Sequence, residues 1–199
     1  MKTKHAKNAN PVGFLNGQQT SPIVTLYFQI NHLKQILRKG WRLRGVKKKF
    51  CESVADHIFG MAILAIFVCE TTFPQLDLLK VITMIIIHEL GEIENGDITP
   101  HDGVLISVKY QKEHDSIQYL LKDFLGGQKY LELWKEFEKG ETPEAKLVKQ
   151  LDKLEMGFQS KIYQLQHGMD VQDFMDSTRK ALSSPELLKI LEEVERIYR

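Results

Sequence analysis

Polar side chains interrupt a largely apolar stretch of this sequence and could meet around a metal ion. His88 and Glu89 are adjacent there, and Glu92 follows one helical turn later. On a helix these side chains can point toward one place, because residues three and four apart lie on the same side. Burying them without partners costs roughly several kcal/mol. A core histidine beside a surface glutamate is the structural alternative.

Two further apolar segments carry isolated polar residues of the same kinds. His57 lies in a segment that Ser53 can cap as a helix, and Asp152 follows Leu151 in another helical segment. Imidazole and carboxylate ligands suit Mn, Co, Fe, Ni or Zn, and two of each leave positions open for water and substrate. An open metal site beside a carboxylate such as Glu92 favours hydrolysis of a small phosphate ester.

The hydrophobic pattern predicts the helices that must bring these residues together. Apolar residues recur at helical spacing, and caps or glycines mark the ends of each pattern. We expect helices over residues 23–39, 53–71, 76–94, 104–125, 130–138, 142–166, 170–181 and 184–198, with an irregular basic segment over 39–53. No segment shows the pattern of a strand. The sequence therefore predicts an all-α fold, a compact multi-helix bundle.

Length and composition restrict the classes of protein to which this chain can belong. Its 199 residues suit one domain, which we place at residues 21–199 after a flexible N-terminal arm at 1–20. The net charge of +1, from 27 basic and 26 acidic residues, provides no field for holding polymeric nucleic acid. We therefore expect a small-molecule substrate and no nucleic-acid polymer.

Location can be predicted from the apolar segments and the cysteines. The longest apolar run, from Met61 to Cys69, is too short to span a bilayer, and the N-terminal stretch lacks the apolar segment of a secretory signal. The two cysteines, Cys51 and Cys69, show no disulfide or metal-finger spacing. We expect a cytoplasmic protein without a membrane partner.

A basic segment over residues 38–49 contains candidate substrate contacts. Arginine can bind a phosphate through two parallel hydrogen bonds, and an indole face can stack on a base or sugar. Arg42, Arg44 and Trp41 are therefore candidates for substrate binding. A solvated charged loop is the alternative explanation for the lysines in this segment.

Taken together, these motifs resemble the HD-domain metal-dependent phosphohydrolases. An isolated His, a His–acid pair and a distant Asp form the pattern of that family. The narrower resemblance is to its 5′-deoxynucleotidase branch and rests on the stretches GWRLRGV (40–46), ESVADH (52–57), GDITP (96–100), EAKLVKQLDKLEM (144–156) and QDFMDST (172–178). The similarity runs from about residue 26 almost to the end of the chain.

The resemblance implies a fold, a reaction and a set of site residues. The fold is an HD-domain helical bundle, and the metal ligands are His57, His88, Glu89 and Asp152. Glu92 matches the catalytic glutamate, and Asp97 matches an aspartate that helps to hold the sugar and the reacting end of the nucleotide. Members of this branch release phosphate from deoxyribonucleoside 5′-monophosphates and use cobalt, manganese or magnesium. They are commonly dimers, so a homodimer is expected.

Two departures from the family pattern bear on function. The second family motif is His-Asp, whereas this chain has His88-Glu89, whose carboxylate lies one methylene further from the backbone. The bacterial branch has an arginine directly before its tryptophan, where this chain has Gly40. Phosphate contact by Arg42 or Arg44 is therefore an inference of ours. The alternatives are another nucleotide substrate (a triphosphate, an alarmone or a cyclic nucleotide) or a catalytically weakened nucleotide-binding protein.

Overall fold

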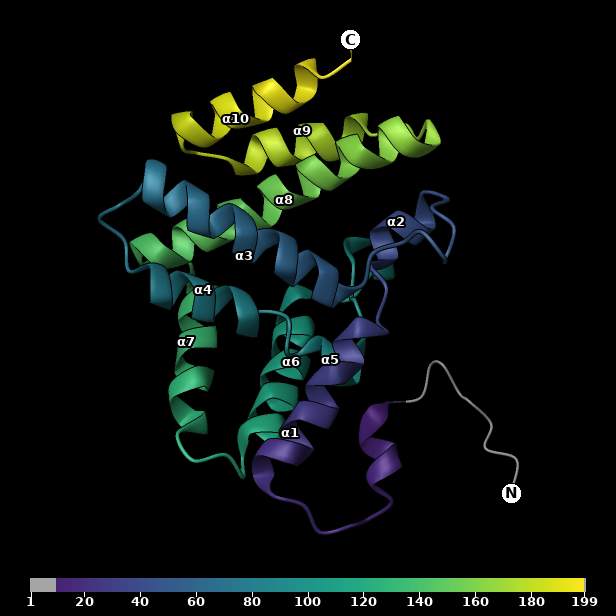
Figure 1. Cartoon of the computed structure of the whole chain (residues 1–199), viewed down its shortest axis with the longest axis vertical. Helices are drawn as coiled ribbons and strands as arrows, with labels where there is room; N and C mark the ends of the chain where they lie inside the picture. Colours follow the sequence, from purple (N-terminus) through teal and green to yellow (C-terminus); the bar gives the residue numbers. More distant parts are fainter. Residues whose placement is uncertain (1–9, 199) are drawn as a thin grey trace.

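A computed structural model describes residues 10–198, which form helices joined by short connections (Figure 1). The α-helices are α1 (Pro22–Ile30), α2 (Lys39–Leu43), α3 (Val54–Thr71), α4 (Leu78–Ile87), α5 (Glu92–Asn95), α6 (Ile106–Leu121), α7 (Gly127–Lys139), α8 (Pro143–His167), α9 (Gln172–Ala181) and α10 (Pro185–Arg196). Three short 3-10 helices are η1 (Pro11–Leu15), η2 (Asn31–Lys34) and η3 (Pro100–Asp102). Among the described residues, β pairing is limited to one isolated bridge between Leu37 and Ser53. The all-α prediction is confirmed.

Helix α3 crosses the middle of the molecule. It packs on α4 and α8, and α8 in turn packs on α9 and α10. Figure 1 shows α9 and α10 on one side of α3 and α1, α6 and α7 on the other, with α8 crossing behind α3. Residues on α3 can therefore face either half of the fold.

Two apolar clusters meet along α3. One joins α3, α4, α8 and α10 through side chains that include Met61, Ala65, Val81, Met84, Ile85, Leu151, Leu154, Leu187 and Leu191. The other joins the start of α3 to α5, α6 and α7 through side chains that include Val54, Ile87, Leu90, Ile93, Ile117 and Trp134. His57 lies on α3 between Val54 of one cluster and Met61 of the other, so it is buried where the clusters meet.

The start of α3 follows the prediction. Ser53 is its N-cap, and the Ser53 hydroxyl accepts a hydrogen bond from the Asp56 backbone N–H, while the Asp56 carboxylate accepts one from the Ser53 N–H. This reciprocal pair satisfies backbone donors that the first helical turn leaves free. The cap fixes where the helix begins and therefore where His57 lies.

The predicted continuous helix over residues 76–94 was wrong. Helix α4 ends at Ile87, and the short α5 begins at Glu92 after a tight turn. In this turn Leu90 N–H bonds the Ile87 carbonyl and Glu92 N–H bonds the Glu89 carbonyl, each three residues back. The His88 carbonyl, which is freed from the helical pattern, accepts a hydrogen bond from the Trp134 indole N–H at 3.3 Å.

Gly91 is required at this turn because α6 approaches its backbone closely. A Cβ atom at Gly91 would lie 2.6 Å from Cβ of Glu113 and 2.9 Å from its Cα. Any other residue would have to displace α6. The turn that carries His88 and Glu89 is therefore fixed against α6.

The predicted first helix over residues 23–39 also differs from the structure. Helix α1 ends at Ile30, η2 follows, and the chain then becomes extended before the short helix α2. Arg38 N–H bonds the Glu52 carbonyl at 3.1 Å, and Val54 N–H bonds the Ile36 carbonyl at 2.8 Å. These bonds hold the start of the basic segment against the start of α3.

The N-terminal arm falls partly outside the described residues. Residues 1–9 of the predicted arm are not described, while residues 11–15 form η1 and Thr20 shares a hydrogen bond of 2.6 Å with Thr25. The mobile arm and the single domain at 21–199 stay predictions.

Within the described chain, α3 is long and apolar enough to cross a membrane by length and composition alone.

We predict that truncating a core residue of α8 costs much more stability than truncating a surface residue of the same helix. Leu154 is fully buried, so Leu154→Ala should lower the free energy of unfolding by about 2–5 kcal/mol. Leu165 is 47% exposed, and Leu165→Ala should change it by about 0.5 kcal/mol or less. Urea titration of the three proteins measures both values, and equal losses would contradict this packing.

Candidate functional site

A pocket with a volume of about 370 Å³ opens beside the turn between α4 and α5. Its walls come from α2, η3, α6, α8 and α9, together with that turn. Most residues that the sequence predicted for the site line it, namely Trp41, Arg44, Glu89, Glu92, Asp97 and Asp152. Residues far apart in the chain therefore share one concave surface.

Three of the four residues predicted as metal ligands have ligand atoms close together, and the fourth, Asp152, contacts one of them. Ligand atoms of His57, His88 and Glu89 all lie within 4.8 Å of one another. Oδ1 of Asp152 lies 3.2 Å from Nε2 of His57, and Oε1 of Glu89 lies 3.4 Å from Nε2 of His88. The structure brings together two imidazoles and two carboxylates.

Both imidazole rings present a free nitrogen to this place. Nδ1 of His88 lies 2.7 Å from the Ile85 carbonyl, which can only accept, so Nδ1 carries the proton. Nδ1 of His57 lies 2.5 Å from Oε2 of Glu155. Among the described residues, Nε2 of each ring is buried and makes no hydrogen bond, although a carboxylate oxygen, of Asp152 or Glu89, lies 3.2 or 3.4 Å from it. Such orphaned atoms are costly unless something binds them, and a divalent ion fits this donor set.

The charges around His57 show that the space between the predicted ligands attracts a cation. Burial and the charge of Arg38 oppose protonation of the ring, yet Asp152 and Glu155 raise the pKa of His57 to about 9. Burial also opposes ionisation of Asp152, but Lys153 and His57 hold the pKa of this carboxyl well below its usual range. A metal ion at Nε2 would take the place of the His57 proton that faces Asp152.

Arg38 is a site residue that the sequence analysis did not single out. Its Nη1 lies 3.3 Å from Oε1 of Glu89, and it lines the pocket. Burial disfavours its charge, but Glu89, Asp152 and Asp97 together raise the pKa of Arg38 further. Among many basic neighbours in this segment, nothing in the sequence distinguishes Arg38.

Glu92 has the surroundings of a proton-transfer group. It is 1% exposed, and its Oε2 has no hydrogen-bond partner among the described residues. Burial, followed by the charges of Glu89 and Asp97, raises the pKa of Glu92 well above its usual value. A carboxyl with a raised pKa can hold and release a proton near neutral pH.

Asp97 and Trp41 fix the position of α2 on the pocket wall. Oδ2 of Asp97 accepts a hydrogen bond of 2.6 Å from the Lys39 backbone N–H, at the start of this helix. Trp41 is 2% exposed, and its indole N–H donates to Glu52 at 2.6 Å. Its ring packs on Phe174 with 4.3 Å between centroids. The indole therefore offers a substrate only the part of its surface that lines the pocket.

The two arginines that were predicted to bind phosphate differ in position. Arg42 does not line the pocket, and its guanidinium donates to the Val46 carbonyl within its own loop. The structure thus gives no support to Arg42 as a phosphate contact. Arg44 lines the pocket and pairs with Asp173.

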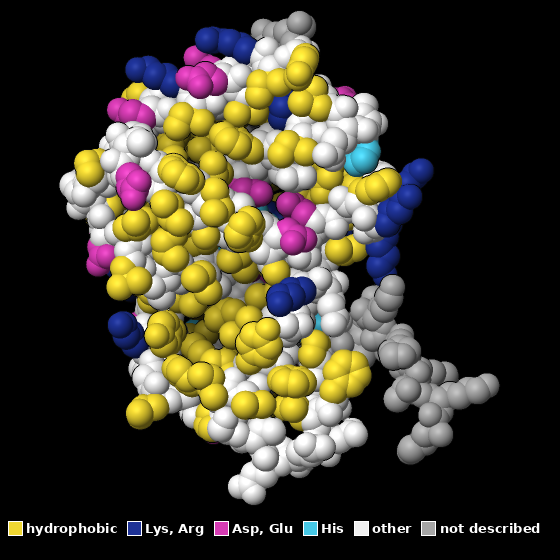
Figure 2. Space-filling model, in the orientation of Figure 1, with side chains coloured by type: hydrophobic (Ala, Val, Ile, Leu, Met, Phe, Trp, Pro, Cys, Tyr) yellow, Lys and Arg dark blue, Asp and Glu magenta, His cyan; other side chains and the backbone are white. Residues whose placement is uncertain are grey.

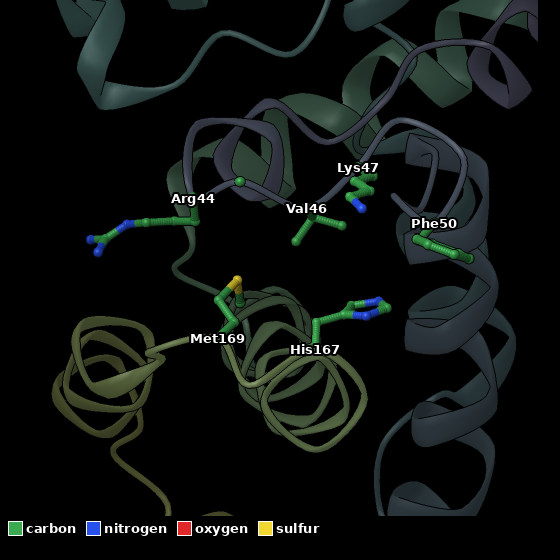
Figure 3. Close-up of a pocket in the computed structure, with 7 residues that line it drawn as sticks. Arg44, Val46, Lys47, Phe50, His167 and Met169 are labelled. Atoms are coloured by element: carbon green, nitrogen blue, oxygen red, sulfur yellow. The ribbon is translucent and has the colours of Figure 1, made fainter.

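Arg44 also borders a second pocket, with a volume of about 280 Å³, between the loop after α2 and the end of α8. Figure 3 shows that its guanidinium points away from Val46 and Lys47 in this second pocket. The second pocket contains none of the predicted metal ligands. Arg44 is therefore oriented toward Asp173, on the wall of the first pocket.

Comparison with known proteins places the site in a family context. A model of the HD domain family matches residues 30–194. The chain is 33% identical over 193 residues to 5′-deoxynucleotidase HDDC2 of Bos taurus, with 94% of this chain and 91% of the relative covered. The relative of the same name from Dictyostelium discoideum is 36% identical over 172 residues, covering 80% and 90%.

Solved structures show the same architecture. A conserved hypothetical protein from Pyrococcus furiosus superposes with a TM-score of 0.71 at 30% identity, covering 87% of this chain and 99% of that one. A predicted metal-dependent phosphohydrolase from Magnetospirillum magnetotacticum gives a TM-score of 0.66 at 23% identity, covering 87% and 91%. The second similarity supports the fold alone.

We predict that this protein binds one divalent transition ion and that binding raises its melting temperature. An ion present at one hundred times its Kd should stabilise the fold by about 2.7 kcal/mol. His88→Ala should abolish most of this shift, because it removes an orphaned ligand atom, whereas His114→Ala in the middle of α6 should retain it. Melting curves with added Mn or Co, together with metal analysis of the purified protein, test this prediction. An ion-independent melting temperature for the wild type would contradict it.

Proposed function

This chain belongs to the HD domain family, and we propose that it removes the 5′-phosphate from (deoxy)ribonucleoside 5′-monophosphates. The observation that carries the proposal is a pair of orphaned imidazole nitrogens, of His57 and His88, beside the buried carboxyl of Glu92. Relatives named 5′-deoxynucleotidase, at 33% and 36% identity, support the same reaction. The protein is thus a phosphohydrolase.

We assign the ion to His57, His88, Glu89 and Asp152, whose donor atoms converge. The donor set suits Co, Mn, Zn, Fe or Ni, and Mg is an ion that this branch of the family uses. When bound, the ion supplies Lewis acidity toward the phosphoryl group and the attacking water. The remaining chemistry falls to residues that do not hold the ion.

Glu92 handles the proton in the proposed reaction. Attack by water forms a new bond to phosphorus and breaks the bond between phosphorus and the 5′-oxygen of the nucleoside. The water must lose a proton and the departing 5′-oxygen must gain one, and a buried carboxyl with a raised pKa can do both. The products are inorganic phosphate and a nucleoside.

The pocket wall provides the groups that orient a nucleotide. Arg38 and Lys109 line it and carry positive charge that suits a phosphate, while Arg44 lies further along the wall. We assign Asp97 to the sugar and the reacting end of the nucleotide, and Trp41 to contact with the nucleoside. A volume of about 370 Å³ is within the range of small-molecule sites.

The longer side chain of Glu89 is compatible with a working site. One of its carboxylate oxygens lies within 4.8 Å of ligand atoms of both histidines, so the extra methylene does not carry it away. Burial opposes its ionisation, but His88 and then Arg38 lower the pKa of Glu89 below its usual value. The carboxylate is therefore ionised and available as a ligand, which favours an active enzyme over a weakened nucleotide-binding protein.

The cysteines agree with a cytoplasmic location. Cys51 and Cys69 are free and buried, as expected for a protein of the reducing cytoplasm. We propose a cytoplasmic enzyme that acts on a small-molecule nucleotide, with no nucleic-acid polymer or membrane as partner.

We also propose a homodimer, and one exposed apolar surface favours it. This α3–α4 face consists of Phe59, Ile63 and Phe67 on α3 with Leu79 and Ile86 on α4, all between 41% and 77% exposed. Figure 2 shows hydrophobic side chains gathered where α3 and α4 cross this side of the molecule. Large exposed apolar patches of this kind are typical of surfaces that bind another protein.

The arrangement of the α3–α4 face suits a second copy of the chain. Phe59, Ile63 and Phe67 are four residues apart, so they form one stripe that is symmetric about Ile63. A two-fold axis through Ile63 would pack α3 antiparallel against its copy and bury the same residues on both subunits. Self-complementarity of this kind is what an isologous dimer requires.

We predict phosphate release from nucleoside 5′-monophosphates in the presence of Mn, Co, Mg or Zn, and little release from 5′-triphosphates. Glu92→Gln keeps the size of the side chain but cannot take a proton, so it should reduce kcat by about 10²–10⁴-fold. The ion-dependent rise in melting temperature should remain in this variant. Glu89→Asp should retain activity with an altered metal preference.

Three outcomes would contradict the proposed reaction. Release from triphosphates, alarmones or cyclic nucleotides but not from monophosphates would favour another substrate of the same fold. Tight nucleotide binding without turnover in any metal would favour the weakened binding protein. Full activity of Glu92→Gln would remove this residue from proton transfer.

We predict that Ile63→Asp dissociates the dimer, because two buried like charges would face each other across the axis. Leu125→Asp is the matched control, since Leu125 is 98% exposed in the turn between α6 and α7. Sedimentation velocity should show a dimer for the wild type and the control and a monomer for Ile63→Asp. A monomeric wild type, or wild-type binding to neutral lipid vesicles through this face, would overturn the dimer.

A further inference from the structure

A buried carboxylate supports the His57 ring from the side opposite the pocket. Oε2 of Glu155 lies 2.5 Å from Nδ1 of His57, and both side chains are buried. His57 comes from α3 and Glu155 from α8, so the contact joins two helices that are distant in sequence. Glu155 does not line the pocket and therefore cannot touch a substrate there.

We infer that Glu155 is a positioning residue, which holds the His57 ring so that Nε2 faces Asp152, Glu89 and His88. This inference rests on the proposed metal centre. A histidine side chain has two free torsions and loses rotational freedom when its second nitrogen is hydrogen-bonded. A carboxylate partner at Nδ1 also makes Nε2 a more basic ligand for a metal ion. Asp152 lies one helical turn before Glu155 on α8, so one helix supplies both an ion ligand and the support for another ligand.

Gly60 gives an independent reason to assign this role. It lies inside α3, where glycine costs about 1 kcal/mol relative to alanine. A Cβ atom at Gly60 would lie 2.8 Å from Oε1 of Glu155 and 3.2 Å from its Cγ. The missing side chain thus leaves the space that the Glu155 carboxylate occupies one turn along α3 from His57.

Glu52, which is partly buried, lies beside this pair and connects it to the pocket wall. Ligand atoms of Glu52, His57 and Glu155 lie within 4.8 Å of one another. Glu52 accepts the indole N–H of Trp41 at 2.6 Å, and its backbone N–H donates to the Tyr163 hydroxyl at 2.9 Å. Glu155 thus lies between Gly60 and the carboxyl of Glu52, and its side-chain hydrogen bond within the described structure is to His57.

The inference predicts weaker binding of the ion when Glu155 is changed. Titration of metal-free protein with Mn or Co should give a Kd about 10–100-fold higher for Glu155→Leu, which removes the contact. Glu155→Gln should give a smaller increase, because its amide oxygen can still accept the Nδ1 proton but carries no charge. Binding calorimetry measures these values without a substrate, so the result does not depend on turnover.

A double-mutant cycle separates positioning from general damage to the fold. Gly60→Ala should raise the Kd in the wild-type background by displacing the Glu155 carboxylate, and it should have little further effect in Glu155→Leu. Gly157→Ala is the matched control, because its Cβ would meet Thr178 at 3.1 Å and Leu191 at 3.2 Å, away from the site. This control should lower the melting temperature without changing the Kd.

The outcomes distinguish this inference from the proposed function. A wild type that binds no divalent ion would refute the proposed metal centre itself. Wild-type affinity in Glu155→Gln and Gly60→Ala, with a wild type that does bind the ion, would overturn the role of Glu155 and leave the proposed reaction intact. If Glu155→Leu fails to fold, these two variants still decide the question.

Discussion

The site depends on ionisable groups being buried where two apolar cores meet. Removing charges from water is costly, and the buried His57 and Glu92 and the partly buried Glu89 and Asp152 are held by opposite charges or hydrogen bonds nearby. The negative and positive groups of the site do not balance. The site holds more carboxylates than the single guanidinium of Arg38 can neutralise, and in the described structure the two inward-facing imidazole nitrogens lie 3.2 and 3.4 Å from carboxylate oxygens without making a hydrogen bond. This imbalance is what a divalent cation would correct.

Contacts between helices that are distant in the sequence hold these residues in place. The cap at Ser53 sets where α3 begins, the turn after α4 carries His88 and Glu89, and α8 passes behind α3 with Asp152 (Figure 1). Tight packing fixes these elements relative to one another, since Gly91 lies directly against α6. This packing holds the ligand residues at fixed positions relative to one another.

Sequence reasoning predicted the parts of this arrangement that leave a local signal. Helical periodicity predicted most of the helices, and polar residues in apolar segments identified the residues that converge, because burial makes such residues rare. The break at residues 88–91 was missed, since the bonds that stabilise it come from Trp134 and from the packing of Gly91 on α6. Arg38 was missed because many basic residues surround it. Glu155 could have been found, because it lies one turn from Asp152 on the same helix face.

The spacing of Asp152 and Glu155 has a consequence for how the chain can vary in length. Each residue of a helix is rotated by about 100° from the one before it. Inserting or deleting one residue in α8 before Asp152 would therefore turn both side chains away from the site. Length changes in the part of α8 before Asp152 should therefore abolish the site, whereas the turn between α6 and α7 carries the almost fully exposed Leu125 and can absorb them. An affinity tag or a fluorescent reporter would be best placed in that turn.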